Sequence, residues 1–475
     1  MVTIGKLTIC MVLLTILTNA GISSAGTAEV SQGDKLTKEE RIFGLTTVYA
    51  AAKQHFAYFE QVPKLDWDKA FMQFLPEVEK EQPLADYYLT LMRFVALLED
   101  GHTNVGFPRN VQEQLDCLPV VLNIIEDKWI VKERYPTDEI LAEDIPPGSI
   151  VISINGMSPA EHYAKTFYPY VPGGERMKLA LLEKNAYYPK GSEVSLELKY
   201  PDGSTHSRKL RANRTDSKRT ADLLEKYFLP FRRLPLFFSK ELPGDIVYIR
   251  YGACNSECND SFMELFSSMK SKWPKAVIFD LRNNGGGNTP EFIPYLINEP
   301  IAECRRDCRW SVAYASARLQ GITNATMANL GFKMWLKSNG LGEVSKRVTL
   351  EWLELAGKDS RIMPADVHYD GKIVILTDAN TASAAEDFVV PLQCAKRATV
   401  IGEPTYGSTG QPIYYNLPGG GWLSICTVKT KYPDGREFID VGCQPDIPVN
   451  RTIKAIVEGR DEVMDAALRF LEQSK

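Results

Sequence analysis

Histidine is rare in this chain: five occur in 475 residues, fewer than the seven tryptophans or the nine cysteines. Chemistry that needs an imidazole base therefore has few candidates, which are His55, His102, His162, His206 and His368. An excess of positive charge is also lacking, because the formal net charge is −5 at pH 7. This balance argues against nucleic acid and against an anionic membrane surface as partners.

A long hydrophobic run occurs only near the N-terminus. Lys6 precedes an apolar stretch over residues 7–17, which is too short to span a membrane comfortably, and small residues follow it. This layout is typical of a secretory signal peptide, here residues 1–25, with cleavage after Ala25 or Ala28. We therefore expect an exported mature chain, periplasmic or secreted, that has no membrane span once the signal is removed.

The cysteines suggest either disulfides or a zinc site. Cys254 and Cys258 form one close pair, and Cys304 and Cys308 form another. Export favours local or cross-paired disulfides, whereas four cysteines in two pairs could also bind zinc. We favour disulfides, because the spacing within each pair is wider than that of a usual zinc knuckle. Four further cysteines lie in largely apolar contexts and are expected to be buried: Cys117, Cys394, Cys426 and Cys443.

Hydrophobic periodicity changes along the chain and predicts an α/β fold with helical and β-rich additions. Strands that alternate with helices in the second half indicate a parallel sheet between layers of helices. A stretch at 300–365 carries no interpretable motif, and its composition predicts a helical insertion or lid. The expected units are an N-terminal helical subdomain at 37–113, a β-rich module at 115–213 with one helix near 159–166, an α/β core at 236–455 and a C-terminal helix at 456–475.

A small-residue stretch at 381–386 lies between an apolar strand at 371–377 and the start of a helix. Such a corner can expose a reactive side chain, and the helix N-terminus supplies free N–H groups with a positive dipole end. Ser383 is therefore a candidate nucleophile, and the N–H of Ala384 is a candidate donor to an oxyanion. The alternative is that Ser383 only caps the helix in a tight corner.

A glycine-rich loop follows another buried strand, at residues 280–287. Its three successive glycines allow backbone N–H groups to approach a ligand closely. The Gly-Lys-Ser/Thr element of a phosphate-binding loop is absent, so an oxyanion-hole loop beside Ser383 suits this sequence better. The alternative is a simple turn from strand to helix.

Among the histidines, His102 stands out by its position. It lies just past Gly101, which is a natural helix stop, and between Asp100 and Thr103. A loop at a helix end can present an imidazole into a cleft, although a single histidine is often only structural. The spacing makes His102 a candidate base for Ser383.

Several motifs occur in an order that resembles the serine peptidase family of C-terminal processing (tail-specific) proteases and the tricorn core. The resemblance covers nearly the whole mature chain, and the ordered set is more specific than any one motif. It implies a crotonase/ClpP-like ββα core, an N-terminal helical subdomain and an inserted PDZ-like domain at 115–213. The motifs are Asp-Gly-His-Thr at 100–103, the strand at 147–156, the glycine-rich loop at 280–287, Thr-Ala-Ser-Ala-Ala-Glu at 381–386, and the segments 402–410 and 442–447.

The same resemblance implies roles for individual residues. Ser383 is the nucleophile, and the backbone N–H groups of Gly286 and Ala384 form the oxyanion hole. One branch of the family activates its serine with a lysine, but Ser408 stands at that position and is assigned here to substrate binding. The tricorn-like branch uses a histidine instead, which His102 matches.

The third catalytic residue departs from the family pattern. The tricorn-like branch carries a glutamate where this chain has Ile439, so we assign the orienting acid to the neighbouring Asp440, with Glu437 as the alternative. The tricorn core also has a serine just before its histidine, where this chain has Gly101.

The resulting expectation is an exported serine endopeptidase that cleaves extended or C-terminal peptide segments. Its partners are peptide or protein substrates, which the PDZ-like domain captures by β-augmentation, and no metal or organic cofactor is required. One alternative is a catalytically silent protein of the same fold that binds peptides or apolar ligands. Another is an acyl-transfer or thioester hydrolase, which export away from coenzyme A disfavours.

Overall fold

The computed structural model describes residues 35–135, 145–214, 235–309 and 352–473. The predicted signal peptide and much of the predicted insertion lie outside these ranges. Within them, no helix combines the length and the apolar character that crossing a membrane requires.

Six strands form the central sheet, in the spatial order β21–β17–β16–β11–β10–β9. Neighbours from β10 to β21 run parallel, and β9 pairs antiparallel with β10 at one edge. This arrangement confirms the predicted mixed α/β fold. The bounds are β9 Phe237–Leu242, β10 Ile246–Tyr251, β11 Ala276–Asp280, β16 Lys372–Thr377, β17 Ala398–Gly402 and β21 Ile447–Pro448.

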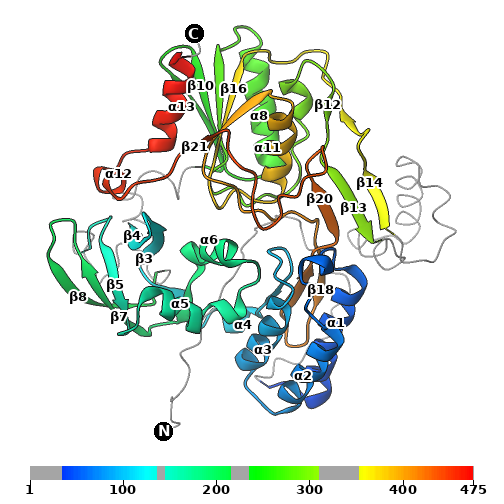
Figure 1. The fold of residues 1–475 in the computed structure, drawn as a ribbon, viewed down its shortest axis with the longest axis vertical. Coiled ribbons are helices and arrows are strands. Elements are labelled where there is room, and N and C mark those ends of the chain that lie inside the picture. The colour runs from blue at the N-terminus through cyan, green and yellow to red at the C-terminus, as the bar shows by residue number, and fades with distance from the viewer. Residues whose placement is uncertain (1–34, 136–144, 215–234, 310–351, 474–475) are drawn as a thin grey trace.

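Helices cover both faces of this sheet (Figure 1). Helices α8 (Ser256–Met269) and α11 (Ala384–Cys394) pack on one face, and α13 (Glu462–Gln473) packs on the other. Successive strand residues point to opposite faces, so Phe279 of β11 joins the cluster of α8 and α11, whereas Ile278 joins that of α13. The strands are therefore buried on both sides, as their continuous apolar runs predict.

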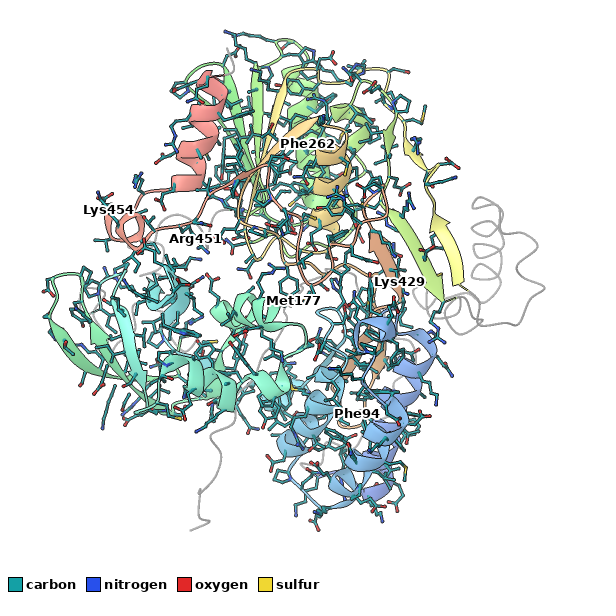
Figure 2. The ribbon with its side chains drawn as sticks, viewed as in Figure 1. Phe94, Met177, Phe262, Lys429, Arg451 and Lys454 are labelled. Atoms are coloured by element: carbon teal, nitrogen blue, oxygen red, sulfur yellow. The ribbon has the colours of Figure 1, made fainter. Side chains whose placement is uncertain are left out.

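The N-terminal segment, where the sequence predicts a helical subdomain, contains the helices α1 (Lys38–His55), α2 (Trp67–Glu79) and α3 (Leu84–Ala96). They pack through aromatic side chains. Trp67 stacks on Phe94, which is labelled in Figure 2, with ring centroids 4.1 Å apart. This packing fixes the C-terminal end of α3, after which the chain enters the His102 loop.

A second sheet, in the order β3–β4–β5–β7–β8, lies in the β-rich module. Its strands are β3 Val120–Ile125, β4 Lys128–Arg134, β5 Ile150–Ile154, β7 Glu193–Lys199 and β8 Thr205–Arg211. The expected helix is α5 (Pro159–Thr166), but a further helix, α6 (Glu175–Asn185), follows it. Met177 and Ala180 of α6 pack on Tyr406 of the core. The apolar residues of α6 thus pack both on its own module and on the core, so they do not form the single apolar stripe by which a helix is recognised in a sequence.

The predicted C-terminal helix at 456–475 is in fact two helices. The first, α12 (Ile453–Glu458), ends at Gly459, whose φ of 65° lies in the left-handed region that favours glycine. Asp461 then accepts a hydrogen bond from the N–H of Met464 at 3.1 Å and begins α13. The break turns α13 back along the central sheet.

The predicted disulfides within the two close cysteine pairs are absent. Cys254, Cys258 and Cys304 are buried free thiols, and every pairing within the predicted set needs at least one of them. Cys254 is instead turned to Asn284, with its Sγ 3.5 Å from the amide nitrogen Nδ2. Over the residues described above, no three His, Cys, Asp or Glu side chains gather in a way that could hold a metal ion.

We predict that these three thiols react fully with iodoacetamide when the purified mature chain is unfolded without a reductant. The physical reason is that none of them is oxidised in the fold. Mass spectrometry of the peptides that contain Cys254, Cys258 and Cys304 would measure the modification, with a sample reduced before alkylation as the control. A peptide that is alkylated only after reduction would contradict the structure.

Candidate active site

The candidate site lies at the carboxyl ends of three adjacent parallel strands, β11, β16 and β17. The loops at 281–287, 378–383 and 403–410 leave these strands at one edge of the sheet. Ligands of open α/β sheets bind at such an edge, where successive loops converge. The fourth contribution comes from the segment between α3 and β1 (Asn104–Gly106), which carries His102.

Ser383 occupies the N-cap position of α11, as expected. Its φ of 57° and ψ of −126° are unusual for a residue with a side chain, so the corner is strained. Its Oγ lies 3.0 Å from Nε2 of His102. The structure therefore brings together the serine and the histidine that are 281 residues apart in the sequence.

His102 is held from both sides of its backbone. Its N–H donates to Oδ2 of Asp100 at 3.2 Å, and its carbonyl accepts from Oγ of Ser424 at 2.8 Å. His102 is 3% exposed, and this burial lowers its pKa to about 4. Burial also raises the pKa of the Asp100 carboxyl to about 6. His102 is therefore neutral near pH 7, as a base must be.

Ser408 provides the partner of the second imidazole nitrogen. Its Oγ lies 2.5 Å from Nδ1 of His102, and its side chain is fully buried. The expected role in substrate binding does not fit this position, because Ser408 faces the histidine and is closed to solvent. Ser383, His102 and Ser408 thus form one hydrogen-bonded series.

Neither acid considered for orienting His102 lies at its Nδ1. The carboxylate of Asp440 accepts a hydrogen bond from the N–H of Gly174 at 3.2 Å, which places it against the start of α6. Glu437 pairs with Lys431 at 2.7 Å. The side chain that lies at Nδ1 is instead that of Ser408.

The glycine-rich loop lies directly against Ser383. A Cβ on Gly286 would lie 2.5 Å from the Cβ of Ser383, and the φ of Gly286 is 95°. Its N–H, however, donates to Oδ1 of Asn284 at 2.9 Å, so this expected oxyanion donor is already engaged. The N–H of Ala384, in the first turn of α11, belongs to the donors that a helix leaves without an internal acceptor.

Glu386 is a component of the site to which the sequence analysis gives no role. Its fully buried carboxylate accepts hydrogen bonds from the N–H groups of Ser383, Gly407 and Ser408 and from the hydroxyl of Thr405. Its position three residues after an N-cap serine is the spacing of a capping box, which was the available signal. The bonds to the 405–408 loop had no sequence signal.

Arg176 of α6 reaches the same loop from the β-rich module. Its guanidinium donates to the carbonyls of Thr405 and Tyr406 at 2.6 and 2.5 Å. Met177 beside it, labelled in Figure 2, packs on Tyr406. The module therefore touches the loop that carries Ser408, and no motif in the sequence indicates this contact.

Residues 245–449 match the model of peptidase family S41. A carboxyl-terminal-processing protease of Synechocystis sp. is 29% identical over 217 residues, which cover 46% of this chain and 41% of that protein. The chloroplastic carboxyl-terminal-processing peptidase 2 of Arabidopsis thaliana is 24% identical over 219 residues, or 45% of this chain and 34% of that protein. The chain thus spans less than half the length of these relatives. The matches confirm the predicted resemblance to the C-terminal processing peptidases.

The fold is similar to that of mature CPAF. Its complex with lactacystin has a TM-score of 0.68 at 17% identity, and the alignment covers 92% of this chain and 98% of that one. Mature CPAF in another crystal structure has a TM-score of 0.66 at 15% identity, with coverage of 88% and 94%. At such identities the likeness concerns the fold, and it extends well beyond residues 245–449.

We predict that Gly286→Ala lowers the rate at which a fluorophosphonate labels Ser383 by at least about 100-fold, the usual effect of a damaged oxyanion hole. The new Cβ would collide with Ser383 and would require a left-handed backbone. Gly285→Ala is the matched control, because a Cβ there meets nothing within 4 Å. Equal labelling of the two variants would contradict this account of the loop.

Proposed function

We propose, on the premise that residues 245–449 are a peptidase family S41 segment, that this chain is an exported serine endopeptidase. It hydrolyses peptide bonds in extended or C-terminal segments of peptides or proteins. The observation that carries the proposal is the hydrogen-bonded series of Ser383, His102 and Ser408 beside the N–H of Ala384. Serine–histidine chemistry of this kind needs neither a metal nor an organic cofactor.

In the first step, Oγ of Ser383 attacks the carbonyl carbon of the substrate and Nε2 of His102 takes the hydroxyl proton. The 3.0 Å separation of these two atoms supports this transfer. The imidazolium then gives its proton to the leaving amine, and an acyl-enzyme remains on Ser383. Water, deprotonated by His102, attacks the acyl carbon. The bond from that carbon to Oγ of Ser383 then breaks, His102 returns the proton to Oγ, and the acid product leaves.

Ser408 orients the base. If Nδ1 of His102 donates to Oγ of Ser408, the lone pair of Nε2 faces Ser383, which is the tautomer that a general base requires. A serine carries no charge, so it fixes the ring without offering the imidazolium a direct negative partner. This difference from a Ser–His–Asp triad agrees with a pKa of about 4 for His102.

The oxyanion is held by the N–H of Ala384, at the positive end of α11. The N–H of Gly286 joins it when the substrate oxygen competes with Oδ1 of Asn284 for this proton. The oxyanion hole is thus complete only when a substrate is bound. A correctly placed substrate carbonyl therefore gains both N–H donors.

The β-rich module at 115–213 acts as a PDZ-like domain that holds a peptide segment. Strand β3 is an edge of its sheet, so its outer backbone groups can pair with an added strand. A cavity of about 560 Å³ lies along this edge, lined among others by Ile124, by Leu179 of α6 and by Arg451, which Figure 2 labels. A peptide bound there lies beside Arg176 and hence near the catalytic loop.

The remaining expectations form part of the same proposal. We propose export under the signal peptide at 1–25, a helical subdomain at 37–113, and a crotonase/ClpP-like peptidase core at 236–455. The proposed helical subdomain is supported by its position, because it leads directly into the loop that carries His102. The proposed peptidase core is supported by the parallel sheet, whose loops converge at one edge.

We predict that Ser383→Ala and His102→Ala each lower fluorophosphonate labelling and peptide hydrolysis more than about 1,000-fold, as removal of a catalytic residue does. Lys372→Ala and Lys396→Ala are the controls. Lys372 begins β16 at the sheet edge opposite Ser383, and Lys396 is exposed beyond the end of α11. Loss of activity in a lysine variant alone would refute the Ser–His assignment, and a folded but unlabelled wild type would favour a silent binding protein.

We predict that Ser408→Ala slows peptide hydrolysis about tenfold, which corresponds to the loss of one hydrogen bond of about 1.4 kcal/mol. The effect should fall on kcat, because Ser408 is buried behind His102 and does not face the substrate. Asp440→Asn serves as the comparison and should retain most activity. A larger loss in Asp440→Asn than in Ser408→Ala would return the orienting role to Asp440.

A further inference from the structure

Glu386 joins the two loops on which the proposed site depends. Its Oε2 accepts from the N–H of Ser383 at 3.0 Å and from the N–H of Ser408 at 3.1 Å. Its Oε1 accepts from the N–H of Gly407 at 2.8 Å and from Oγ1 of Thr405 at 2.5 Å. One side chain thus bonds to the backbone of the nucleophile and to the loop that orients the base.

All four partners of Glu386 are donors. The three backbone N–H groups cannot accept a hydrogen bond. Thr405 Oγ1 already accepts from the N–H of Cys443 at 2.7 Å, which directs its own proton to Glu386. A protonated carboxyl could keep these contacts only if its O–H donated to Thr405 Oγ1 and the threonine proton turned away, and the three N–H bonds would then lose the negative charge that strengthens them. The four donors therefore favour the ionised form.

We infer that Glu386 is a positioning residue of the proposed peptidase: its carboxylate clamps the 405–408 loop to the backbone of Ser383, and protonation weakens the clamp. The inference rests on the proposed function, because the clamp matters through the position of Ser408 and hence of His102. Glu386 touches neither the substrate nor the reacting atoms. Its effect is on the geometry of the groups that do.

The surroundings of Glu386 leave few other groups that titrate with it. The charges and dipoles that act on it come from Arg176 of α6, Tyr406 and Cys443. Burial raises the pKa of Tyr406 and of Cys443 well above their usual values, and Arg176 remains a cation despite a lowered pKa. Asp100 is the other carboxyl near the site that titrates in an accessible range.

Burial raises the pKa of Glu386 from 4.5 to about 7, against the opposing effect of the four hydrogen bonds. The clamp is therefore at full strength above about pH 7 and weakens progressively below it. His102, with a pKa of about 4, stays neutral across this range. An acid limb of activity near pH 7 thus distinguishes Glu386 from the base.

The first test is the rate of fluorophosphonate labelling of the mature chain from pH 5 to 9. We expect the wild-type rate to fall below about pH 7, approaching tenfold per pH unit. Glu386→Gln should label at least about tenfold more slowly at pH 8 and show no inflection near pH 7, because its amide NH₂ meets donors. Asp387→Asn, which removes the next buried carboxylate of α11, should keep the inflection.

A pair of substitutions at Thr405 tests whether the inflection in the labelling rate arises from Glu386. Thr405→Val removes one donor to the carboxylate and should move the limb upward by about one pH unit. Thr405→Ser keeps the hydroxyl and should restore the wild-type limb. Asp100→Asn should leave the inflection near pH 7 in place. Coincident profiles for the valine and wild-type chains, or loss of the inflection in Asp100→Asn alone, would overturn the inference.

A second measurement does not depend on catalysis. A carboxyl whose pKa is raised by folding contributes stability that is present below its unfolded pKa and is lost as pH rises through its folded pKa. The unfolding free energy of wild type relative to Glu386→Gln should therefore decrease between about pH 5 and 8. A constant difference would overturn the inference even if wild type were labelled. An unlabelled wild type that shows the decrease would count against the peptidase but not against the clamp.

Discussion

A buried carboxylate without a cationic hydrogen-bond partner joins the two halves of the site. Transferring such a charge from water costs several kcal/mol even after relaxation, so it persists only where donors replace the lost hydration. Glu386 has four, and they come from the nucleophile corner and from the loop at 405–408. Each hydrogen bond to a charged group contributes about 1.5–3 kcal/mol, so the four together hold the two loops to each other. In the proposed peptidase, this attachment positions Ser408 and hence His102 relative to Ser383.

The base is governed by burial more than by charge. In a Ser–His–Asp arrangement a carboxylate stabilises the imidazolium directly, whereas here Nδ1 meets a neutral serine. The nearest carboxyl along the chain, that of Asp100, contacts His102 through its backbone N–H and not through its imidazole. The histidine consequently resists protonation, which keeps it available as a base but makes the developing cation less favourable. In the proposed mechanism, the positive end of α11 and the N–H of Gly286 compensate by stabilising the oxyanion.

Local sequence signals predicted the parts of the site that are local. A strand followed by small residues and a helix identified Ser383 and Ala384, and a helix stop identified the His102 loop. Contacts between distant segments could not be predicted from local patterns. The hydrogen bond between His102 and Ser408, for example, joins residues that are 306 positions apart. Proximity in sequence to a family motif misled the assignment of Asp440, whose side chain turns to α6. The fold class was predictable from alternating patterns, whereas α6 was not, since its apolar residues face both its own module and the core.

Gly101 leaves the space in which Ser408 meets the histidine. A Cβ at position 101 would lie 3.0 Å from Oγ of Ser408 and 2.7 Å from Cε1 of Tyr406. The absence of a side chain at position 101 and the small hydroxyl at position 408 therefore depend on each other. A designer who wished to install a lysine at 408 would have to rebuild the loop before His102 in the same step.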